Sequence, residues 1–265
     1  MTALPPPQDL GDRARAELSA LIDRQISPLG LAAMDALAPT LGQTVLDIGC
    51  GAGETILQLA HRVGPKGQVL GVDLAPRVLD VARVRTRHLA QVTLMQADAA
   101  LLPLPAESVD GIFSRFGTMF FADPPAAFYN LRGLLKRGGK IGFVCWRSMD
   151  ENEIDFFPLA AVGLSGKADG APFSFEHAGT IEQVLRSAGF EDIRIAAHDD
   201  QISCGDAEAT LEVVTRVGAL GVILRESPVL KGEVLGPVRT ALSKRERDGE
   251  VKLGAATWIV TATAP

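Results

Sequence analysis

Residues 45–53 read Val-Leu-Asp-Ile-Gly-Cys-Gly-Ala-Gly, an apolar strand pattern that runs directly into three glycines at alternate positions, Gly49, Gly51 and Gly53. A turn without side chains at the carboxyl end of a buried strand lets a ligand lie against bare backbone. The helix that follows offers unpaired N–H groups at the same place. The stretch therefore predicts a binding site for a nucleotide-like cofactor.

Outward from this stretch, apolar segments alternate between strand and helix patterns from about residue 43 to residue 146. Such alternation is typical of an α/β fold whose parallel sheet has helices on both faces. Turn-forming residues at 64–67 and 136–139 separate helices from strands. We expect strands at 44–48, 68–72, 92–96, 109–114 and 140–146, and helices at 54–63, 77–89 and 124–135.

The pattern becomes irregular after residue 146. We expect an insertion over 148–179, a helix at 181–187, a strand near 193–197, helices at about 207–217 and 229–247, and a last strand at 256–263. A helix near 14–26 and a segment at 30–38 precede the sheet. The chain should form a single domain over 1–265, with an N-terminal helical cap (1–40), a cofactor-binding core (43–147), a substrate-cap insertion (148–180) and a helical insertion (205–250).

Composition excludes several classes of protein. With 47% hydrophobic and 22% charged residues, the chain has the composition of an ordinary globular protein. Its net charge of −6 argues against nucleic acid binding, which needs a basic surface. The three cysteines, Cys50, Cys145 and Cys204, are too far apart for a metal or disulfide framework. No basic leader or membrane-length apolar run is present, so we expect a cytoplasmic protein that binds no membrane and no metal.

The spacing of the glycines separates two kinds of nucleotide site. A dinucleotide fingerprint reads G-x-G-x-x-G, and here the third glycine comes one position early. Asp47 precedes the loop, where a carboxylate opposes a pyrophosphate and favours a cationic group. Asp73 ends the second strand and could accept from ribose hydroxyls, while Asp98 follows the third strand and could accept from an adenine amino group. Three acids at successive strand ends therefore indicate a binding site for an adenosine that carries a cationic tail.

At this point the chain resembles the class I S-adenosylmethionine-dependent methyltransferases, in particular the bacterial small-molecule branch around the quinone-biosynthesis C-methyltransferases. The motifs that carry the resemblance occur in order: residues 45–53, Gly-Val-Asp-Leu-Ala-Pro at 71–76, Gln-Ala-Asp-Ala at 96–99, Ser-Val-Asp-Gly-Ile-Phe-Ser at 108–114 and Leu-Lys-Arg-Gly-Gly-Lys-Ile at 135–141. The resemblance implies a Rossmann-like, seven-stranded, mostly parallel sheet whose last strand is antiparallel, together with a helical cap.

The resemblance also implies a role for each motif residue in binding S-adenosyl-L-methionine. The methionine portion would be held by Asp47, Gly49 and Gly51, and Gly53 would let the following helix approach. The ribose, the adenine and the methionine tail would be contacted by Asp73, Leu74, Asp98, Ala99 and Ser114. Structural interpretations stand beside these roles, because Asp47 could cap a helix and Asp98 could cap the turn after its strand. For Asp110 we favour a structural role.

The methyl acceptor would lie near residues 114–121, an apolar segment that leaves the fourth strand. Phe116 or Phe120 could line an apolar pocket and face a sulfonium by a cation–π contact, or could simply pack beneath the cap. Arg115 could orient an anionic or carbonyl-bearing acceptor, or could pair with a neighbouring acid. His177 is the best candidate for a general base, since His61 and His88 lie on or just beyond helices that cover the sheet.

We therefore expect a methyltransferase that acts on a small, hydrophobic or aromatic metabolite by in-line transfer. Two alternatives stay open. An NAD(P)-dependent oxidoreductase would share the sheet and Asp73, but it needs the wider glycine spacing and a catalytic tyrosine, and the single tyrosine, Tyr129, lies in an expected helix. A non-catalytic S-adenosylmethionine-binding module would bind the cofactor without turnover. The accepting atom and the oligomeric state are not indicated by the sequence.

Overall fold

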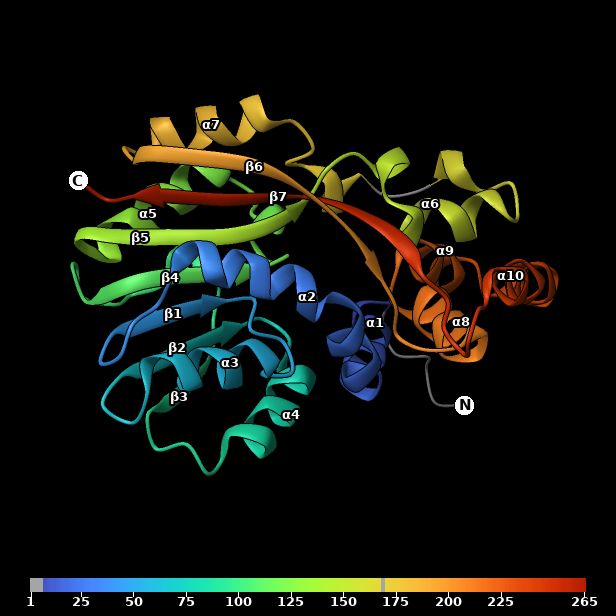
Figure 1. Cartoon of the computed structure of the whole chain (residues 1–265), viewed down its shortest axis with the longest axis horizontal. Helices are drawn as coiled ribbons and strands as arrows, with labels where there is room; N and C mark the ends of the chain where they lie inside the picture. Colours follow the sequence, from blue (N-terminus) through green and yellow to red (C-terminus); the bar gives the residue numbers. More distant parts are fainter. Residues whose placement is uncertain (1–6, 168–169) are drawn as a thin grey trace. The chain divides into compact units, whose positions relative to one another are not determined.

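A seven-stranded sheet forms the centre of the fold in the computed structural model, which describes residues 7–167 and 170–265 (Figure 1). The strands lie in the order β3-β2-β1-β4-β5-β7-β6, and β5 pairs with β7 antiparallel while β1 to β5 pair in parallel. The expected Rossmann-like fold is confirmed. The strand bounds are β1 Thr44–Ile48, β2 Gln68–Asp73, β3 Val92–Gln96, β4 Val109–Arg115, β5 Leu135–Trp146, β6 Glu191–Ile202 and β7 Leu253–Thr263.

The order of the strands reverses between β1 and β4, which places the loops after these two strands side by side. Ile48, the last residue of β1, pairs with Ser114 of β4. Crossover connections on the two sides of such a reversal leave the sheet toward opposite faces, so a crevice opens at the carboxyl ends of the strands. The glycine stretch begins at this point.

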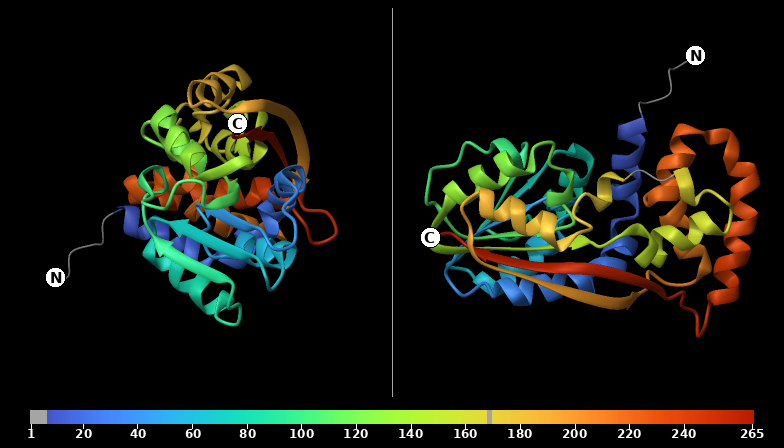
Figure 2. Two further views of the ribbon diagram at one scale, coloured as in Figure 1. Left: turned by 90° about the vertical axis from the view of Figure 1, so that its left-hand side faces the viewer. Right: turned by 90° about the horizontal axis from the view of Figure 1, so that it is seen from above.

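Helices cover both faces of the parallel strands, as Figure 1 and Figure 2 show. On one face lie α3 (Glu54–Val63) and α4 (Pro76–Thr86), and on the other lie α5 (Pro124–Leu134) and α7 (Ala178–Ser187). α3 is amphipathic: it buries Ile56, Leu59 and Val63 at helical spacing and exposes His61. α5 begins at Asp123, whose side chain accepts from the N–H of Ala126 at 3.1 Å.

Internal contacts divide the chain into two compact units. The sheet unit comprises residues 28–147, 171–198 and 257–265, and the helical unit comprises the described residues of 1–27, 148–170 and 199–256. The helical unit has its own apolar core, which includes Leu159, Leu211, Leu224, Val238 and Leu242. Its helices are α1 (Pro7–Glu17), the first part of α2 (Ser19–Leu37), α6 (Glu153–Ala160), α8 (Ala207–Arg216), α9 (Ala219–Glu226) and α10 (Lys231–Arg245).

Several elements differ from the expectations. The region after residue 148, expected to be irregular, contains α6, and the eight-residue α9 is a third helix where two were expected. β5 begins at Leu135 instead of residue 140, because residues 136–139 form a bulge between the pairs Val109↔Leu135 and Gly111↔Lys140. β6 and β7 are longer than predicted, and α4 ends at Thr86. α2 continues through Pro28 without a break. Part of the expected 1–40 cap and of the 148–180 insertion lies outside the described residues.

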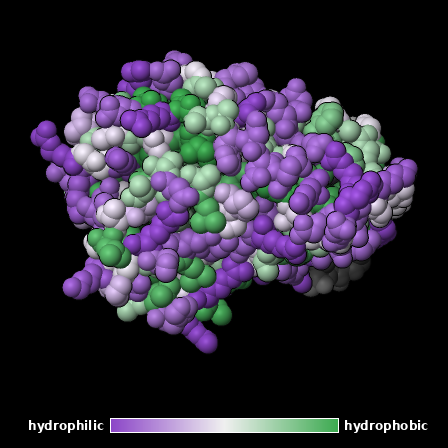
Figure 3. All heavy atoms as spheres, viewed as in Figure 1, coloured by the Kyte–Doolittle hydropathy of each residue, from purple (hydrophilic) through white to green (hydrophobic). Residues whose placement is uncertain are grey.

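The surface is mainly polar. On the face drawn in Figure 3, polar side chains predominate and apolar ones interrupt them in small groups. Within the described part of the chain, no helix combines the length and the apolar character that a membrane crossing requires.

Candidate functional site

The glycine stretch forms a turn that only glycine adopts without strain. Gly49, Gly51 and Gly53 have φ angles of 68°, 52° and 87°, all in the left-handed region. A Cβ on Gly49 would lie 3.1 Å from the Cα of Gly117, so the loop after β4 packs directly on the glycine turn. A Cβ on Gly51 would meet no protein atom within 4 Å. The turn is therefore closed toward the protein at Gly49 and open at Gly51.

Gly53 permits a close helix contact, but the helix is not the following one. A Cβ there would lie 3.0 Å from the Cβ of Ala82, which belongs to α4. α3 begins at the next residue, with Gly53 as its N-cap. Because α4 leads on toward β3, this contact sets the position of the second crossover relative to the turn.

Asp47 is a buried carboxylate with one oxygen unsatisfied. Its Oδ2 accepts from the hydroxyl of Thr55 in the first turn of α3, whereas its Oδ1 has no hydrogen-bond partner among the described residues. Burial raises the pKa of Asp47 to about 7, the Thr55 hydrogen bond and the charge of Arg115 oppose that rise, and Asp73 adds to it. Asp47 does not cap α3, whose N-cap is Gly53. A buried, partly satisfied carboxylate is a receptor for a cation.

Asp73 fastens the second strand end to the glycine turn. Its Oδ2 accepts from the N–H of Gly51 and its Oδ1 accepts from the N–H of Ala75, both at 2.9 Å. Each carboxylate oxygen has further lone-pair capacity, so these bonds orient the group without exhausting it. Asp73 is thus hydrogen-bonded directly to the glycine turn.

The third strand end places Asp98 and Ala99 at the start of a short 3-10 helix. Oδ1 of Asp98 accepts from the N–H of Ala100 at 2.9 Å, so the capping interpretation describes one of its two oxygens. Ala99 is buried, and Leu74, directly after Asp73, is 66% exposed. Because the side chain of Leu74 is so exposed and lies near Asp73 and Asp98, it is available to pack on a planar ring.

Ser114 holds the loop after β4 against β1. Its hydroxyl donates to the carbonyl of Ile48 at 2.8 Å and accepts from the N–H of Gly117 at 3.2 Å. The side chain is fully buried. Its hydroxyl thus joins the last residue of β1, directly before the glycine turn, to the loop after β4.

Phe116 makes the turn that follows β4. It has a φ of 59°, which is strained for a bulky residue, and its ring stacks on Trp146 with centroids 4.0 Å apart and planes at 14°. Phe120, in the next turn, is 59% exposed. Of the two phenylalanines expected at a substrate pocket, one is paired with an aromatic partner and the other faces outward.

Arg115 pairs with an acid, which is one of the two roles predicted for it. Its guanidinium donates to Glu54, the first residue of α3, and its side chain is 9% exposed. A Cβ on Gly30 of α2 would lie 2.6 Å from Cδ of Arg115, so the helix backbone rests on the stem of this side chain.

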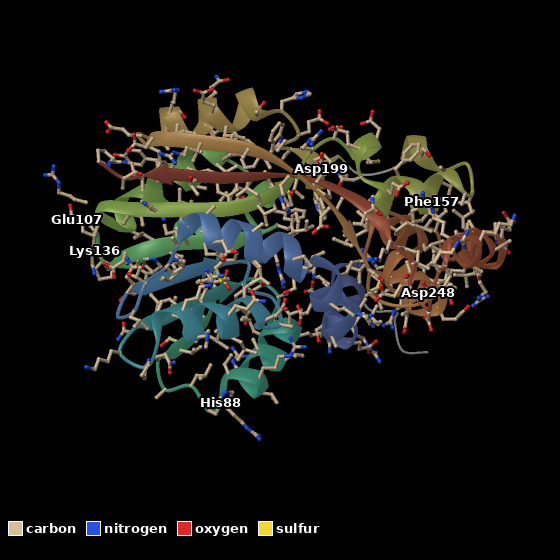
Figure 4. The ribbon with its side chains drawn as sticks, viewed as in Figure 1. His88, Glu107, Lys136, Phe157, Asp199 and Asp248 are labelled. Atoms are coloured by element: carbon tan, nitrogen blue, oxygen red, sulfur yellow. The ribbon has the colours of Figure 1, made fainter. Side chains whose placement is uncertain are left out.

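Three of the four histidines are exposed at the surface of the sheet unit. His177, the predicted base, is 77% exposed and lies 3.3 Å from Glu176, its neighbour in sequence. His61 and His88 are exposed, as expected, and His88 projects outward after α4 (Figure 4).

The carboxylate of Asp110 accepts hydrogen bonds from the N–H of Thr44 and from the ammonium of Lys136. Its structural role is confirmed.

Four residues of the site region were not singled out by the sequence. Glu54 and Thr55 occupy the first turn of α3, and Trp146 ends β5. The hydroxyl of Thr118 is buried and has no partner among the described residues. Helical spacing would have found Thr55, since the first turn of the helix after the glycines must face the strand end that carries Asp47.

Two hollows lie away from the glycine turn. One of about 220 Å³ is bordered by Leu37, Gln43, Val45, Asp110 and Lys140, at the amino end of the parallel strands. A shallow one of about 590 Å³ lies in the helical unit against α6 and α10, with Phe157 and Arg245 on its walls. Among the described residues, no cluster of His, Cys, Asp and Glu could hold a metal ion.

Comparisons with known proteins place the chain in a family. A sequence model described as a methyltransferase domain matches residues 45–139. Nocamycin O-methyltransferase of Saccharothrix syringae is 28% identical over 261 residues, which cover 90% of this chain and 88% of that protein. The 2-phytyl-1,4-naphtoquinone methyltransferase of Thermosynechococcus vestitus is 30% identical over 176 residues, which cover 61% of this chain and 78% of that protein.

A solved structure agrees in fold. Phosphoethanolamine N-methyltransferase 2 of Haemonchus contortus, in complex with phosphomonomethylethanolamine and S-adenosylhomocysteine, superposes with a TM-score of 0.61 at 19% identity. The match covers 99% of this chain and 61% of the longer one. The oxidoreductase and binding-module alternatives gain no support from these comparisons. The chain therefore belongs to the family of S-adenosylmethionine-dependent methyltransferases.

Proposed function

We propose that this protein transfers a methyl group from S-adenosyl-L-methionine to a small, hydrophobic or aromatic metabolite. The observation that carries the proposal is the unsatisfied Oδ1 of Asp47, buried at the carboxyl edge of the sheet where the glycine turn begins. The names of the relatives support the acceptor class, because nocamycin and a phytyl-naphthoquinone are such metabolites.

The residues around the turn suit this cofactor. The ammonium group of its methionine portion would complete the hydrogen bonding of Asp47, and the open side of Gly51 leaves room for a ligand against backbone. Gly49 and Gly53 shape the turn, and Ser114 steadies the loop beside it. When bound, the cofactor supplies an electrophilic methyl group on a positively charged sulfur.

The nucleoside end would be held by residues of β2 and β3. Asp73 is already oriented by two backbone bonds and keeps lone pairs for ribose hydroxyls. Asp98 has a second oxygen for the adenine amino group, with Ala99 beside it and Leu74 exposed for packing on the ring. These roles are proposals that follow from the family and from the positions of the side chains.

Catalysis by this fold rests mainly on alignment of the acceptor, which can supply about 7–11 kcal/mol of the barrier. The pair of Phe116 and Trp146 offers a flat apolar surface, and Phe120 an exposed ring. His177 as a general base and Arg115 as an acceptor-orienting residue stay predictions. A cytoplasmic location, the absence of nucleic acid or membrane partners and the single-domain organisation also stay predictions.

Cofactor binding is the first test. Isothermal titration with S-adenosyl-L-methionine and S-adenosylhomocysteine should show binding at micromolar to low millimolar concentration, and NADH should show none. Binding of NADH alone would sink the proposal. Transfer of labelled methyl to a panel of naphthoquinones and aromatic polyketides should then identify the acceptor class, and label on none of them would contradict that part.

The roles of the acceptor-side residues can be separated with the same assay. If His177 is the base, His177→Ala lowers turnover while the affinity for S-adenosyl-L-methionine is kept. Unchanged turnover at saturating acceptor eliminates it. Substitution of the exposed His88 by Ala is the matched control, because it changes the same type of side chain away from the glycine turn.

A further inference from the structure

Two consecutive residues in the first turn of α3 are tied to two neighbouring strands. Thr55 donates to Asp47 of β1, and Glu54 pairs with Arg115 at the end of β4. The Glu54 and Arg115 side chains are 21% and 9% exposed, so water screens the pair less than it screens a surface pair. The N-terminus of a helix carries a partial positive charge, which favours Glu54 at this position as well.

α2 meets Arg115 through a position that has no side chain. A Cβ on Gly30 would approach Cδ of Arg115 to 2.6 Å, closer than a real Cβ comes to another atom. Since Gly30 lies within a helix and has no positive φ, its backbone conformation does not require glycine. The requirement comes from the packing of Arg115, to which the three nearest atoms belong.

We infer that Arg115 is a positioning residue of the cofactor site, which fixes the first turn of α3 over Asp47, and that Gly30 fixes Arg115. The inference rests on the proposed function and assigns Arg115 to the methionine end of the cofactor. It differs from the predicted role in orienting the acceptor. α2 thereby contributes to the cofactor site through its packing against Arg115.

The charges around Asp47 give this inference an electrostatic signature. Arg115 lowers the pKa of Asp47, while burial and the charge of Asp73 raise it. The Thr55 hydroxyl stabilises the ionised form, and the buried thiol of Cys50 also lies within the field of Asp47. An ammonium ligand binds the ionised carboxylate, so loss of the Arg115 cation weakens binding and moves its pH dependence upward.

The experiment measures the affinity of the full chain for S-adenosyl-L-methionine and S-adenosylhomocysteine by isothermal titration from pH 6 to pH 9. Arg115→Met should raise the Kd of both ligands about tenfold at pH 7, the effect expected on losing a hydrogen bond to a charged group. The pH midpoint of binding should rise by about one unit. Arg115→Lys keeps the cation and should restore most of the midpoint.

Gly30→Ala and Glu54→Gln test the two ends of the arrangement. Both substitutions should raise the Kd for the two ligands several-fold. Glu54→Gln should not raise the pH midpoint of binding, because the cation of Arg115 is retained. The matched control is Gly133→Ala in α5, where an added Cβ meets no atom within 4 Å, and it should leave the Kd unchanged. Thermal unfolding of each variant reports whether it folds.

Three results decide the matter. If the natural chain binds neither ligand, the proposed function fails. If it binds both, and Arg115→Met keeps the natural Kd and midpoint, the function stands and the positioning role is wrong. If Arg115→Met does not fold, Gly30→Ala and Glu54→Gln carry the test: a natural Kd in both overturns the inference.

Discussion

The sheet unit and the helical unit use polar side chains in different ways. In the sheet unit, Asp47 is buried with one oxygen unsatisfied, and its partner must come from outside the described residues. In the helical unit, Glu153 accepts two hydrogen bonds from Arg245 and a third from the N–H of Gly254, and Asp155 accepts from the N–H at the start of α9. An unsatisfied carboxylate indicates a ligand, whereas satisfied ones hold the fold.

Stability is also distributed differently. The helical unit depends on ordinary apolar packing of helices such as α8, α9 and α10, and many sequences can provide it. The glycine turn depends on positive φ angles and on atoms that leave no room for a side chain. The part of the chain that would specify the cofactor is therefore also the part that tolerates least change.

The largest effect is expected at Asp47. Asp47→Asn should raise the Kd for S-adenosyl-L-methionine by a factor of about thirty to five thousand, because truncating a buried charge pair costs about 2–5 kcal/mol. Thermal stability should be kept or should rise, since a buried carboxylate is removed. Titration calorimetry and thermal unfolding check the two parts. Asp110→Asn is the control, and equal losses of affinity in both variants would contradict the assignment.

Gly51 and Gly53 should separate binding from stability. Gly53→Ala should lower the free energy of unfolding by about 2–4 kcal/mol, because it combines a left-handed φ with a contact 3.0 Å from Ala82. Gly51→Ala lacks the contact and should cost only about 1–2 kcal/mol, yet its Cβ occupies the open side of the turn and should weaken cofactor binding strongly. Denaturant unfolding and calorimetry measure the two. Equal unfolding costs would refute the packing role of Gly53.

The pH dependence should run in opposite directions for folding and for binding. The pKa of Asp47 is raised from 3.8 to about 7, so its contribution to stability is full at low pH and is lost as the pH rises toward 7. Cofactor affinity should rise over the upper part of the same range, because the ammonium requires the ionised carboxylate. Unfolding and binding curves from pH 5 to pH 9 test this. Asp47→Asn should flatten both, and unchanged slopes would show that another group titrates.

The smallest effect is expected in the helical unit. Arg245→Met removes the bidentate pair with Glu153 and the contact of the guanidinium with the ring of Phe157, 4.4 Å away. Because both charged side chains are about one-third exposed, the loss should be only about 1 kcal/mol. Cofactor affinity should be unchanged. A loss of affinity comparable to that of Asp47→Asn would break the contrast between the two units.

Much of the sheet unit could be predicted from the sequence because backbone geometry restricts the residue types there. The positions of β1 to β4 follow from apolar runs, and Asp47, Asp73 and Asp98 lie at or just beyond the carboxyl ends of the first three strands. The strand expected at 140–146 is shorter than β5, because the bulge at 136–139 resembles a turn in sequence and Gly138 has a φ of 75°. The apolar periodicity could not reveal that β5 pairs with β4 both before and after this bulge.

The helical unit was harder to predict for a physical reason. α9 spans eight residues, only about two turns, and begins after Gly218, so its apolar pattern is too brief to identify a helix. Pairs such as Glu54 with Arg115 join residues 61 positions apart, and no local pattern announces them. The prediction of His177 rests on its residue type and its place in the expected insertion, and only the fold shows that it is exposed.

The late position of β7 in the sequence affects when the sheet can be completed during synthesis. β6 joins the sheet through β7, which begins about fifty residues later. At about 5–20 residues per second, a ribosome needs several seconds to cover that interval, during which β6 has no partner strand. The chain emerging in that time forms α8, α9 and α10, so a burst of protease during synthesis should cut at β6 before translation reaches β7 and spare it afterwards.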